Sequence, residues 1–370
     1  MSEYIKGFNG LRFYSILLVI LTHLGISKYF EDGSYCRDNV FYFFSGTAGV
    51  NIFFTISGFL ITTLILSEIK LTGKFNLKLF FIRRFLRLLP PILPFFIAIL
   101  FFMKQGYIAE TITGLFFSVF YLYNFVPKSK IFWSTELSHT WSLAVEEQFY
   151  ILWAFLFSTF NLSKIKKIIF LLLILCIFTS YILPLISVNI EGKKYILDNV
   201  FFTTRWTIPA IGPILIGALF AILNFSNWNN IKLKFKGKKS LFLSILVFIS
   251  PFYLPIILLP LINLFHGLGI ALILLWITNN QSSVFVKILE WKPIKYFGTI
   301  SYGIYIWQGF FLRTDPNITP KIGLHNFPQN VIFTILVAIL SFELFEKRIL
   351  KIKNKFKIKS YSAINTQNKI

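Results

Sequence analysis

Stretches of about 20 mostly apolar residues recur along the whole chain, the length that a helix needs to cross the hydrocarbon core of a bilayer. No other feature restricts the possible folds as strongly. Hydrophobic residues make up 56% of the 370 residues, whereas charged residues make up only 14%. A soluble domain has no interior large enough for so much apolar surface. The sequence therefore predicts an all-α polytopic membrane protein.

The apolar stretches predict about ten transmembrane helices. We expect them at residues 8–27, 48–68, 88–104, 140–159, 168–187, 201–224, 240–256, 258–278, 298–313 and 330–346. The further apolar stretch 107–126 is interpreted as a re-entrant or interfacial segment, because counting it as a span would place Lys164, Lys166 and Lys167 outside. With ten spans, both termini are expected on the cytoplasmic side.

The distribution of basic residues favours this topology. The net charge is +22, and 26 of the 37 Lys and Arg residues fall in segments expected on the cytoplasmic side. Such a bias follows the positive-inside rule. The positive charge is therefore interpreted as an orientation signal and an attraction to the lipid bilayer. A nucleic-acid partner is not expected.

The predicted domain organisation is simple. Residues 1–346 are expected to form a single transmembrane domain, and residues 347–370 a basic, disordered cytoplasmic tail. The first apolar stretch lacks a basic n-region and a cleavage site, so it is expected to remain as a helix. Cys36 and Cys176 have no metal-binding or redox spacing, so neither a metal site nor a disulfide framework is expected.

Two ionisable residues, Arg12 and His23, interrupt the first apolar stretch. They are eleven residues apart, so they lie on one face of a helix, separated by roughly 16 Å of rise. Because burying such groups in a membrane is costly, they indicate a functional track through the bilayer. The alternative is that His23 is a helix-packing residue and that Arg12 extends to the headgroups.

The second predicted helix contains the sequence FFTISGF, with Ser57 and Gly58 near its middle. Small residues allow helices to approach closely, and a serine hydroxyl can form a hydrogen bond across a helix interface. Packing is one interpretation of this pair. A role in shaping a narrow channel for a substrate arm is the other.

An arginine-rich segment, RRFLRLLPP, precedes the third predicted helix. Arg84 and Arg87 are three residues apart and therefore share a helix face, and Arg83 is adjacent to them. The planar guanidinium group suits phosphate oxygens better than the lysine ammonium does. The segment is thus predicted to bind phosphate, although an ordinary positive-inside cluster has the same charge. Pro90 and Pro91 are expected to mark where the next span begins.

The segment HTWSLAVEEQFY places Glu146 and Glu147 about two turns inside the fourth predicted helix. Their depth suggests that Glu146 meets His23, and a carboxylate that orients one imidazole nitrogen leaves the other free to act as a base. The alternative is a structural glutamate paired with Arg12 or Arg205. Farther along, Tyr302 and its aromatic neighbours are either interfacial residues or walls of a site.

Taken in this order, these segments resemble the acyltransferase 3 family of integral membrane O-acyltransferases. The family motifs fall on Arg12 and His23 (Arg-x10-His), Ser57 to Phe59 (S-G-F), Arg84 and Arg87 (Arg-x-x-Arg), Trp141 to Tyr150 (W-S-L-x-x-E-x-x-F-Y) and Ile300 to Trp307 (I-S-Y-x-x-Y-x-W). The resemblance covers about residues 5 to 350. Each motif alone is weak, whereas their combination is specific.

This resemblance implies a bacterial, multi-pass inner-membrane enzyme that uses cytoplasmic acyl-CoA, most often acetyl-CoA, to O-acylate a carbohydrate of the cell envelope. The expected acceptor is an O-antigen, capsule, exopolysaccharide or other glycan. The implied site residues are His23 and Glu146 in catalysis, Arg12, Ser57, Glu147 and Tyr302 along the acyl arm, and Arg83, Arg84 and Arg87 at the coenzyme phosphates. No metal is expected.

Two departures from the family pattern qualify this expectation. Gln308 stands where family members often have His, and glutamine cannot carry a proton. The extra esterase-like domain of some relatives is not found, so a separate glycan-processing partner is expected if one is needed. The alternative function is a lipid-linked sugar flippase or transporter, in which Arg12, His23 and Glu146 form a conduction or proton path. The sequence shows no internal repeat, which argues against that alternative.

Overall fold

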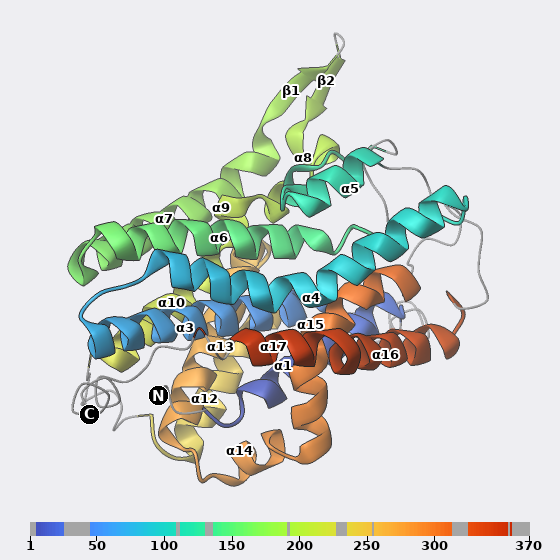
Figure 1. Ribbon diagram of the computed structural model, residues 1–370. Coiled ribbons are helices and arrows are strands. Elements are labelled where there is room, and N and C mark those ends of the chain that lie inside the picture. Colours follow the sequence, from blue (N-terminus) through green and yellow to red (C-terminus); the bar gives the residue numbers. More distant parts are fainter. Residues whose placement is uncertain are drawn as a thin grey trace.

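The computed structural model describes residues 5–25, 45–108, 112–129, 136–190, 193–226, 235–253, 255–312, 325–353 and 356. Its described residues are mainly helical, and the longer helices α4, α6 and α7 run alongside one another (Figure 1). The longer helices are α1 Phe8–His23, α3 Gly46–Thr72, α4 Leu77–Lys104, α6 Thr140–Thr159, α7 Leu162–Ile182, α10 Gly212–Phe225, α12 Lys238–Ile249, α13 Ile262–Asn279, α15 Lys292–Phe311 and α16 Gln329–Ser341. The shorter ones are α5 Ile112–Val119, α8 Leu197–Val200, α9 Thr207–Ala210, α14 Val284–Leu289 and α17 Lys347–Lys353.

Within these described residues, five helical segments are long and apolar enough to cross a membrane. They are Gly46–Thr72, Leu77–Lys104, Leu162–Leu185, Ile257–Asn279 and Gln329–Ile352. The apolar helices α1 and α10 are shorter. The chain is therefore a multi-pass membrane protein, as predicted. The number of ten spans and the cytoplasmic position of both termini remain predictions.

Helix α3 lies at the centre of the bundle and packs against α1, α10 and α13. Ser45 caps its first turn by accepting a hydrogen bond from the Ala48 N–H, at 3.1 Å. Gly73 ends it with a left-handed backbone (φ 77°), a conformation that glycine adopts without steric cost. Because α3 is enclosed, its polar residues face neighbouring helices rather than lipid.

Close backbone contact fixes α3 against α10. A Cβ atom added to Gly58 would lie 1.9 Å from the carbonyl oxygen of Ile214, and one added to Gly217 would lie 2.1 Å from that of Thr55. Each helix therefore supplies a glycine at the point where the other helix approaches, which is the small-residue packing typical of membrane helices. The packing interpretation of Gly58 agrees with this contact.

Helix α4 differs from the predicted third span. It begins at Leu77, where Asn76 accepts a hydrogen bond from the Leu79 N–H at 3.0 Å, and it continues through Pro90 and Pro91. The expectation that these prolines mark the start of the span was wrong. The arginine-rich turns belong to the same helix and connect the prolines to its capped start at Leu77. Transmembrane helices tolerate internal proline where neighbouring groups form hydrogen bonds with the freed backbone carbonyls.

One expected span is divided into shorter elements, and two segments outside the expected spans also have a defined form. The stretch expected at 201–224 is divided into a 3₁₀ turn at Thr203–Arg205, α9 and α10, and a proline lies in the first turn of α10. The stretch 107–126 contains only α5, whose eight residues are too short for a span, and a 3₁₀ turn. An antiparallel hairpin, β1 Ser187–Ile190 with β2 Lys193–Ile196, projects from the helices (Figure 1).

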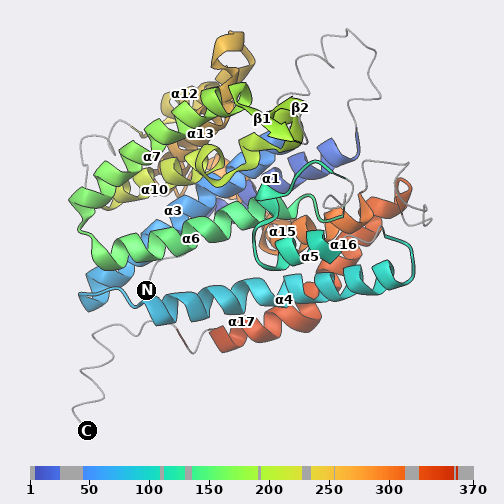
Figure 2. The same cartoon turned by 90° about the horizontal axis from the view of Figure 1, so that it is seen from above.

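The C-terminal part of the chain stays helical beyond the predicted domain boundary. Helix α16 continues through a π-helical turn, Phe342–Glu346, into α17, which lies beside α4 in both views (Figures 1 and 2). Residues 347–353 are thus helical where a disordered tail was expected. The rest of the predicted tail, apart from Phe356, lies outside the described residues.

Candidate active site

A first cavity, which we name the arginine cavity, brings together residues from five helices. It has a volume of about 80 Å³. The polar residues that line it are Arg12 on α1, Ser57 on α3, Arg84 and Arg87 on α4, Glu146 and Tyr150 on α6, and Thr299, Ser301 and Tyr302 on α15. The structure thus gathers six of the nine predicted site residues around one space.

The charge in the arginine cavity is unbalanced. The Arg84 guanidinium faces both carboxylates, with Nη2 4.0 Å from Glu146 Oε1 and 3.8 Å from Glu147 Oε1. It also stacks over the ring of Tyr150, 3.4 Å from its centroid. Arg12 and Arg87 form no salt bridge with any described residue. Three guanidinium groups therefore face two carboxylates, which favours an anionic ligand.

The Glu146 carboxylate accepts two hydrogen bonds within the arginine cavity. The Ser57 hydroxyl donates a hydrogen bond to its Oε1 at 2.5 Å, and the Tyr150 hydroxyl donates another to the same oxygen. The Ser57 contact links the S-G-F segment of α3 to α6. Charge-assisted hydrogen bonds of this kind fix the orientation of the carboxylate.

A second, larger space, the histidine cavity, has a volume of about 350 Å³. Its lining includes both His23 and His139, the amide side chains of Asn51 and Asn263, the aromatic residues Phe54, Trp141, Phe202 and Tyr305, and Arg205. Arg205 stacks over Trp141 and Phe202, with its guanidinium carbon 5.3 and 4.1 Å from the ring centroids. A cavity of this size, with aromatic walls and a few polar groups, has the character of a small-ligand site.

The expected pairing of His23 with Glu146 is not seen. His23 lines the histidine cavity and Glu146 lines the arginine cavity, and no hydrogen bond joins them among the described residues. The depth argument was wrong because α1 ends at His23 itself, rather than at residue 27. His23 is therefore at the very end of its helix, whereas Glu146 is in the interior of α6.

Aromatic side chains lie between the two cavities. Phe53 lines the arginine cavity and Tyr305 lines the histidine cavity, and their rings meet edge to face with centroids 6.0 Å apart. Phe54, the next residue on α3, packs in the same manner against Trp141 at 6.1 Å. We name the Phe53–Tyr305 pair the aromatic partition, because each ring faces one of the two spaces.

His139 is a site residue that the sequence analysis missed. Its ring packs between Phe95 and Tyr305, with centroid separations of 5.6 and 5.5 Å. Gly309 on α15 makes room for it, since a Cβ there would lie 2.1 Å from the imidazole Cε1. The signal available was its position two residues before Trp141, at the start of the WSL motif.

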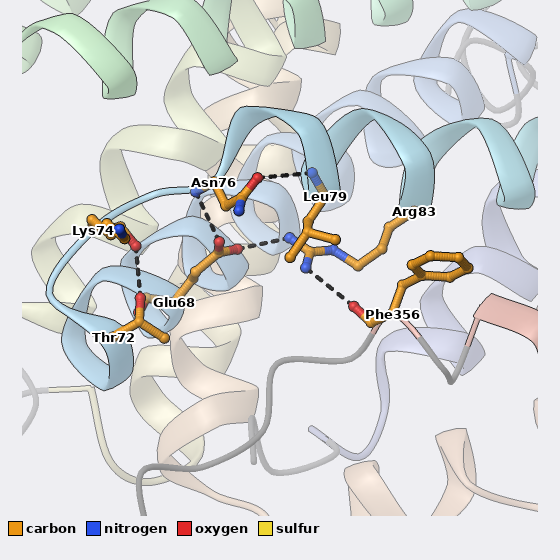
Figure 3. Close-up of polar contacts among 7 residues, drawn as sticks. All are labelled: Glu68, Thr72, Lys74, Asn76, Leu79, Arg83 and Phe356. Carbon is orange, nitrogen blue, oxygen red and sulfur yellow. Dashed lines mark hydrogen bonds and ion pairs between the residues drawn. The ribbon is translucent and has the colours of Figure 1, made fainter. Parts of the chain in front are cut away.

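Arg83 does not join the other two arginines. Its Nη2 is 2.7 Å from Glu68 Oε2 on α3, and its Nη1 donates to the Phe356 carbonyl at 3.4 Å (Figure 3). The other Glu68 oxygen accepts the Asn76 N–H at 2.9 Å, at the start of α4. These bonds join the end of α3 to the start of α4, so the structure gives Arg83 a role in fixing this turn.

Tyr302 and Gln308, which belong to the last family motif, are both on α15. Tyr302 lines the arginine cavity, and its buried hydroxyl has no partner among the described side chains and backbone groups. Gln308 is fully buried, and its amide atoms likewise have no partner there. No cluster of three or more His, Cys, Asp or Glu side chains occurs among the residues that the structure describes.

Comparison with known proteins decides the family. The family model described as an acyltransferase domain matches residues 5–345. The chain belongs to the acyltransferase 3 family. This membership confirms the resemblance drawn from the motifs, which now have a place in the fold. The motif residues Arg12, Ser57, Arg84, Arg87 and Glu146 all line the arginine cavity.

The curated relatives of this acyltransferase 3 protein are longer than the chain. It is 28% identical over 375 residues to the O-acetyltransferase OatA of Staphylococcus aureus, covering 94% of this chain and 58% of that protein. It is 27% identical over 382 residues to the peptidoglycan O-acetyltransferase OatA of Listeria monocytogenes, covering 94% and 56%. The chain thus spans a little over half the length of these relatives. No solved structure matches it.

Proposed function

We propose that this protein is a membrane O-acetyltransferase that transfers an acetyl group from cytoplasmic acetyl-CoA to a hydroxyl group of a cell-envelope glycan, of which peptidoglycan is the best candidate. One observation carries the proposal. A cavity rich in arginine and a cavity that contains histidine lie within one membrane domain, on either side of the aromatic partition. The names of the relatives, O-acetyltransferase and peptidoglycan O-acetyltransferase, support both the acetyl group and the peptidoglycan acceptor.

The donor half of the proposed reaction uses the arginine cavity. The phosphate groups of the coenzyme bind at Arg84 and Arg87, and Arg12 adds a third positive charge. Glu146 and Glu147 orient the Arg84 guanidinium, which keeps its fork directed into the cavity. The volume of about 80 Å³ is too small for the whole coenzyme, so only a part of it can enter. The nucleotide part therefore stays at the mouth of the cavity.

The acceptor half uses the histidine cavity. The thioester end of the coenzyme arm must first pass the aromatic partition into the histidine cavity. The His23 imidazole then takes the proton of the glycan hydroxyl while the hydroxyl oxygen forms a bond to the thioester carbonyl carbon. The tetrahedral intermediate then collapses, the carbon–sulfur bond breaks, and its electron pair leaves with the coenzyme as a thiolate. The proton on His23 finally returns to the thiolate or to water. The products are an O-acetyl ester and free coenzyme A.

The decisive experiment measures acetyl transfer from radiolabelled acetyl-CoA to soluble peptidoglycan fragments by purified protein in lipid nanodiscs. Replacing His23 with Gln should lower kcat by roughly 10²- to 10⁴-fold, because glutamine has no proton-accepting nitrogen. His325→Gln is the matched control, since that histidine lines neither cavity. Near-normal transfer by His23→Gln contradicts the role of the base.

The alternative of a flippase or transporter predicts a different result. A transporter consumes no thioester, so wild-type protein would release no coenzyme A from acetyl-CoA.

A further inference from the structure

A buried polar network joins α3 to α13 beside the histidine cavity. The Asn51 side-chain nitrogen is 2.9 Å from the Asn263 side-chain oxygen and 3.2 Å from His266 Nδ1. Asn51 and His266 are only 3% and 2% exposed. Asn51 and Asn263 line the cavity, and His266 lies behind them. Nothing in the proposed chemistry uses any of these three side chains.

The network leaves two amide atoms available to a ligand. With both hydrogens of the Asn51 NH₂ group donated, its carbonyl oxygen remains as an acceptor, and the Asn263 NH₂ group remains as a donor. If both amides are reversed, the Asn263 NH₂ donates to Asn51, and the histidine N–H donates as well. The remaining atoms are then the Asn51 NH₂ and the Asn263 carbonyl. In either assignment the pair presents one donor and one acceptor side by side.

His266 makes this arrangement specific. Its hydrogen bond prevents the Asn51 amide from rotating freely, and its ring packs against Phe248 at a centroid separation of 5.1 Å. The donor and acceptor are therefore preorganised before a ligand enters. Preorganisation reduces the entropic cost of binding and raises the penalty for a ligand without matching groups.

The surroundings of the pair suit a sugar. Trp141 and Phe54 form an aromatic wall of the same cavity, with ring centroids 6.1 Å apart. Hydroxyl groups are both donors and acceptors, so neighbouring hydroxyls on a pyranose ring complement an adjacent donor and acceptor. The apolar C–H face of the ring is matched by aromatic carbon. The volume of about 350 Å³ accommodates a single sugar residue.

We infer that Asn51 and Asn263 form a hydroxyl-binding subsite for the acceptor carbohydrate. One hydroxyl donates to the free amide carbonyl, and a neighbouring hydroxyl accepts from the free amide NH₂. His266 is a positioning residue that acts through Asn51. The inference rests on the proposed function and adds to it the side chains that recognise the acceptor, on the wall formed by α3 and α13.

The test combines variants with altered acceptors in nanodisc-embedded protein. Acetyl transfer from acetyl-CoA is measured with the soluble peptidoglycan disaccharide and with those of its monodeoxy analogues that keep the hydroxyl acetylated on the parent disaccharide. On wild-type protein, at least one analogue should lose about tenfold to a hundredfold in kcat/KM, because its missing hydroxyl leaves a buried amide atom without a partner. Asn263→Leu should lower kcat/KM for the parent disaccharide by a similar factor.

Combining the deoxy analogue with the Asn263→Leu variant shows whether Asn263 binds a hydroxyl of the acceptor or only packs between helices. If Asn263 binds the hydroxyl, the analogue that fails on wild-type protein should lose little more on Asn263→Leu. If the network only joins α3 to α13, the two losses multiply, and the inference is overturned. Asn279→Leu is the matched control, since Asn279 is on the same helix but does not line the cavity.

Failure of this inference is separable from failure of the proposed function. If wild-type protein transfers no acetyl group to any acceptor, the proposed function falls and the subsite falls with it. If wild-type protein transfers acetyl groups but accepts every deoxy analogue equally well, only the subsite is overturned. That second result needs no variant, so misfolding of Asn263→Leu leaves the test decisive. His266→Leu, with Asn263 intact, should raise KM for the disaccharide more than it lowers kcat.

Discussion

Replacing Gly58 with Ala tests whether the contact between α3 and α10 sets the geometry of the arginine cavity. The added methyl carbon would lie 1.9 Å from the Ile214 carbonyl oxygen, and ordinary contact begins near 3.4 Å. The obstacle is backbone, so no side-chain rotation relieves it, and the helices must separate locally by about 1.5 Å. Overpacking of this kind costs typically 1–3 kcal/mol.

The separation also displaces a neighbouring group. Ser57 precedes Gly58 on α3, and its hydroxyl bonds to Glu146 at 2.5 Å. A shift of about 1 Å in a positioning contact can lower the rate by about 10²-fold. We therefore expect Gly58→Ala to lower kcat/KM for acetyl transfer by one to two orders of magnitude, with a reduced temperature of unfolding.

The assay is radiolabelled acetyl transfer by purified protein, together with thermal unfolding followed by tryptophan fluorescence. Gly303→Ala on α15 is the matched control, because it also adds a methyl group to a buried helical glycine. There the nearest atom is a flexible Glu346 oxygen at 3.3 Å, so little loss is expected. Equal activities for Gly58→Ala and wild type would refute the reasoning that this contact positions Ser57.

Three further predictions concern individual contacts. Arg84→Gln should raise KM for acetyl-CoA by about tenfold to a hundredfold, because it removes a charge-assisted contact to phosphate, while KM for the glycan changes little; equal effects on both KM values would contradict phosphate binding. Glu146→Gln should lower kcat/KM more than Glu147→Gln in the same transfer assay, since only Glu146 accepts hydrogen bonds from neighbouring side chains in the described structure. Gly309→Ala should lower activity as much as His139→Ala, because the new methyl group occupies the space of the imidazole; a fully active Gly309→Ala would show that the position of this ring is unimportant.

The assignment as a multi-pass membrane protein was predictable, because it depends on the hydrophobicity and charge of short sequence segments. Apolar length and the placement of Lys and Arg are local properties, and α6 matches its predicted bounds at Thr140–Thr159. The motif spacing also placed Arg84 and Arg87 on one helix face, and the structure directs both into the same cavity. Local periodicity and composition were sufficient for these conclusions.

The errors arose where the answer depended on how helices are placed relative to one another. His23 and Glu146 appeared close because depth was counted from helix ends, and the true end of α1 was not visible in the sequence. Arg83 resembled its neighbours by residue type, yet it is on the side of α4 that meets Glu68. His139 was missed because its surroundings come from Phe95 and other residues distant in the sequence.

The aromatic partition affects how readily water could hydrolyse the acetyl donor in the proposed reaction. A thioester is an activated compound, and an open passage from the outside would allow bulk water to hydrolyse it without any acceptor. In the proposed reaction, Phe53 and Tyr305 would keep solvent in the histidine cavity away from a coenzyme arm in the arginine cavity until the thioester passes these two rings.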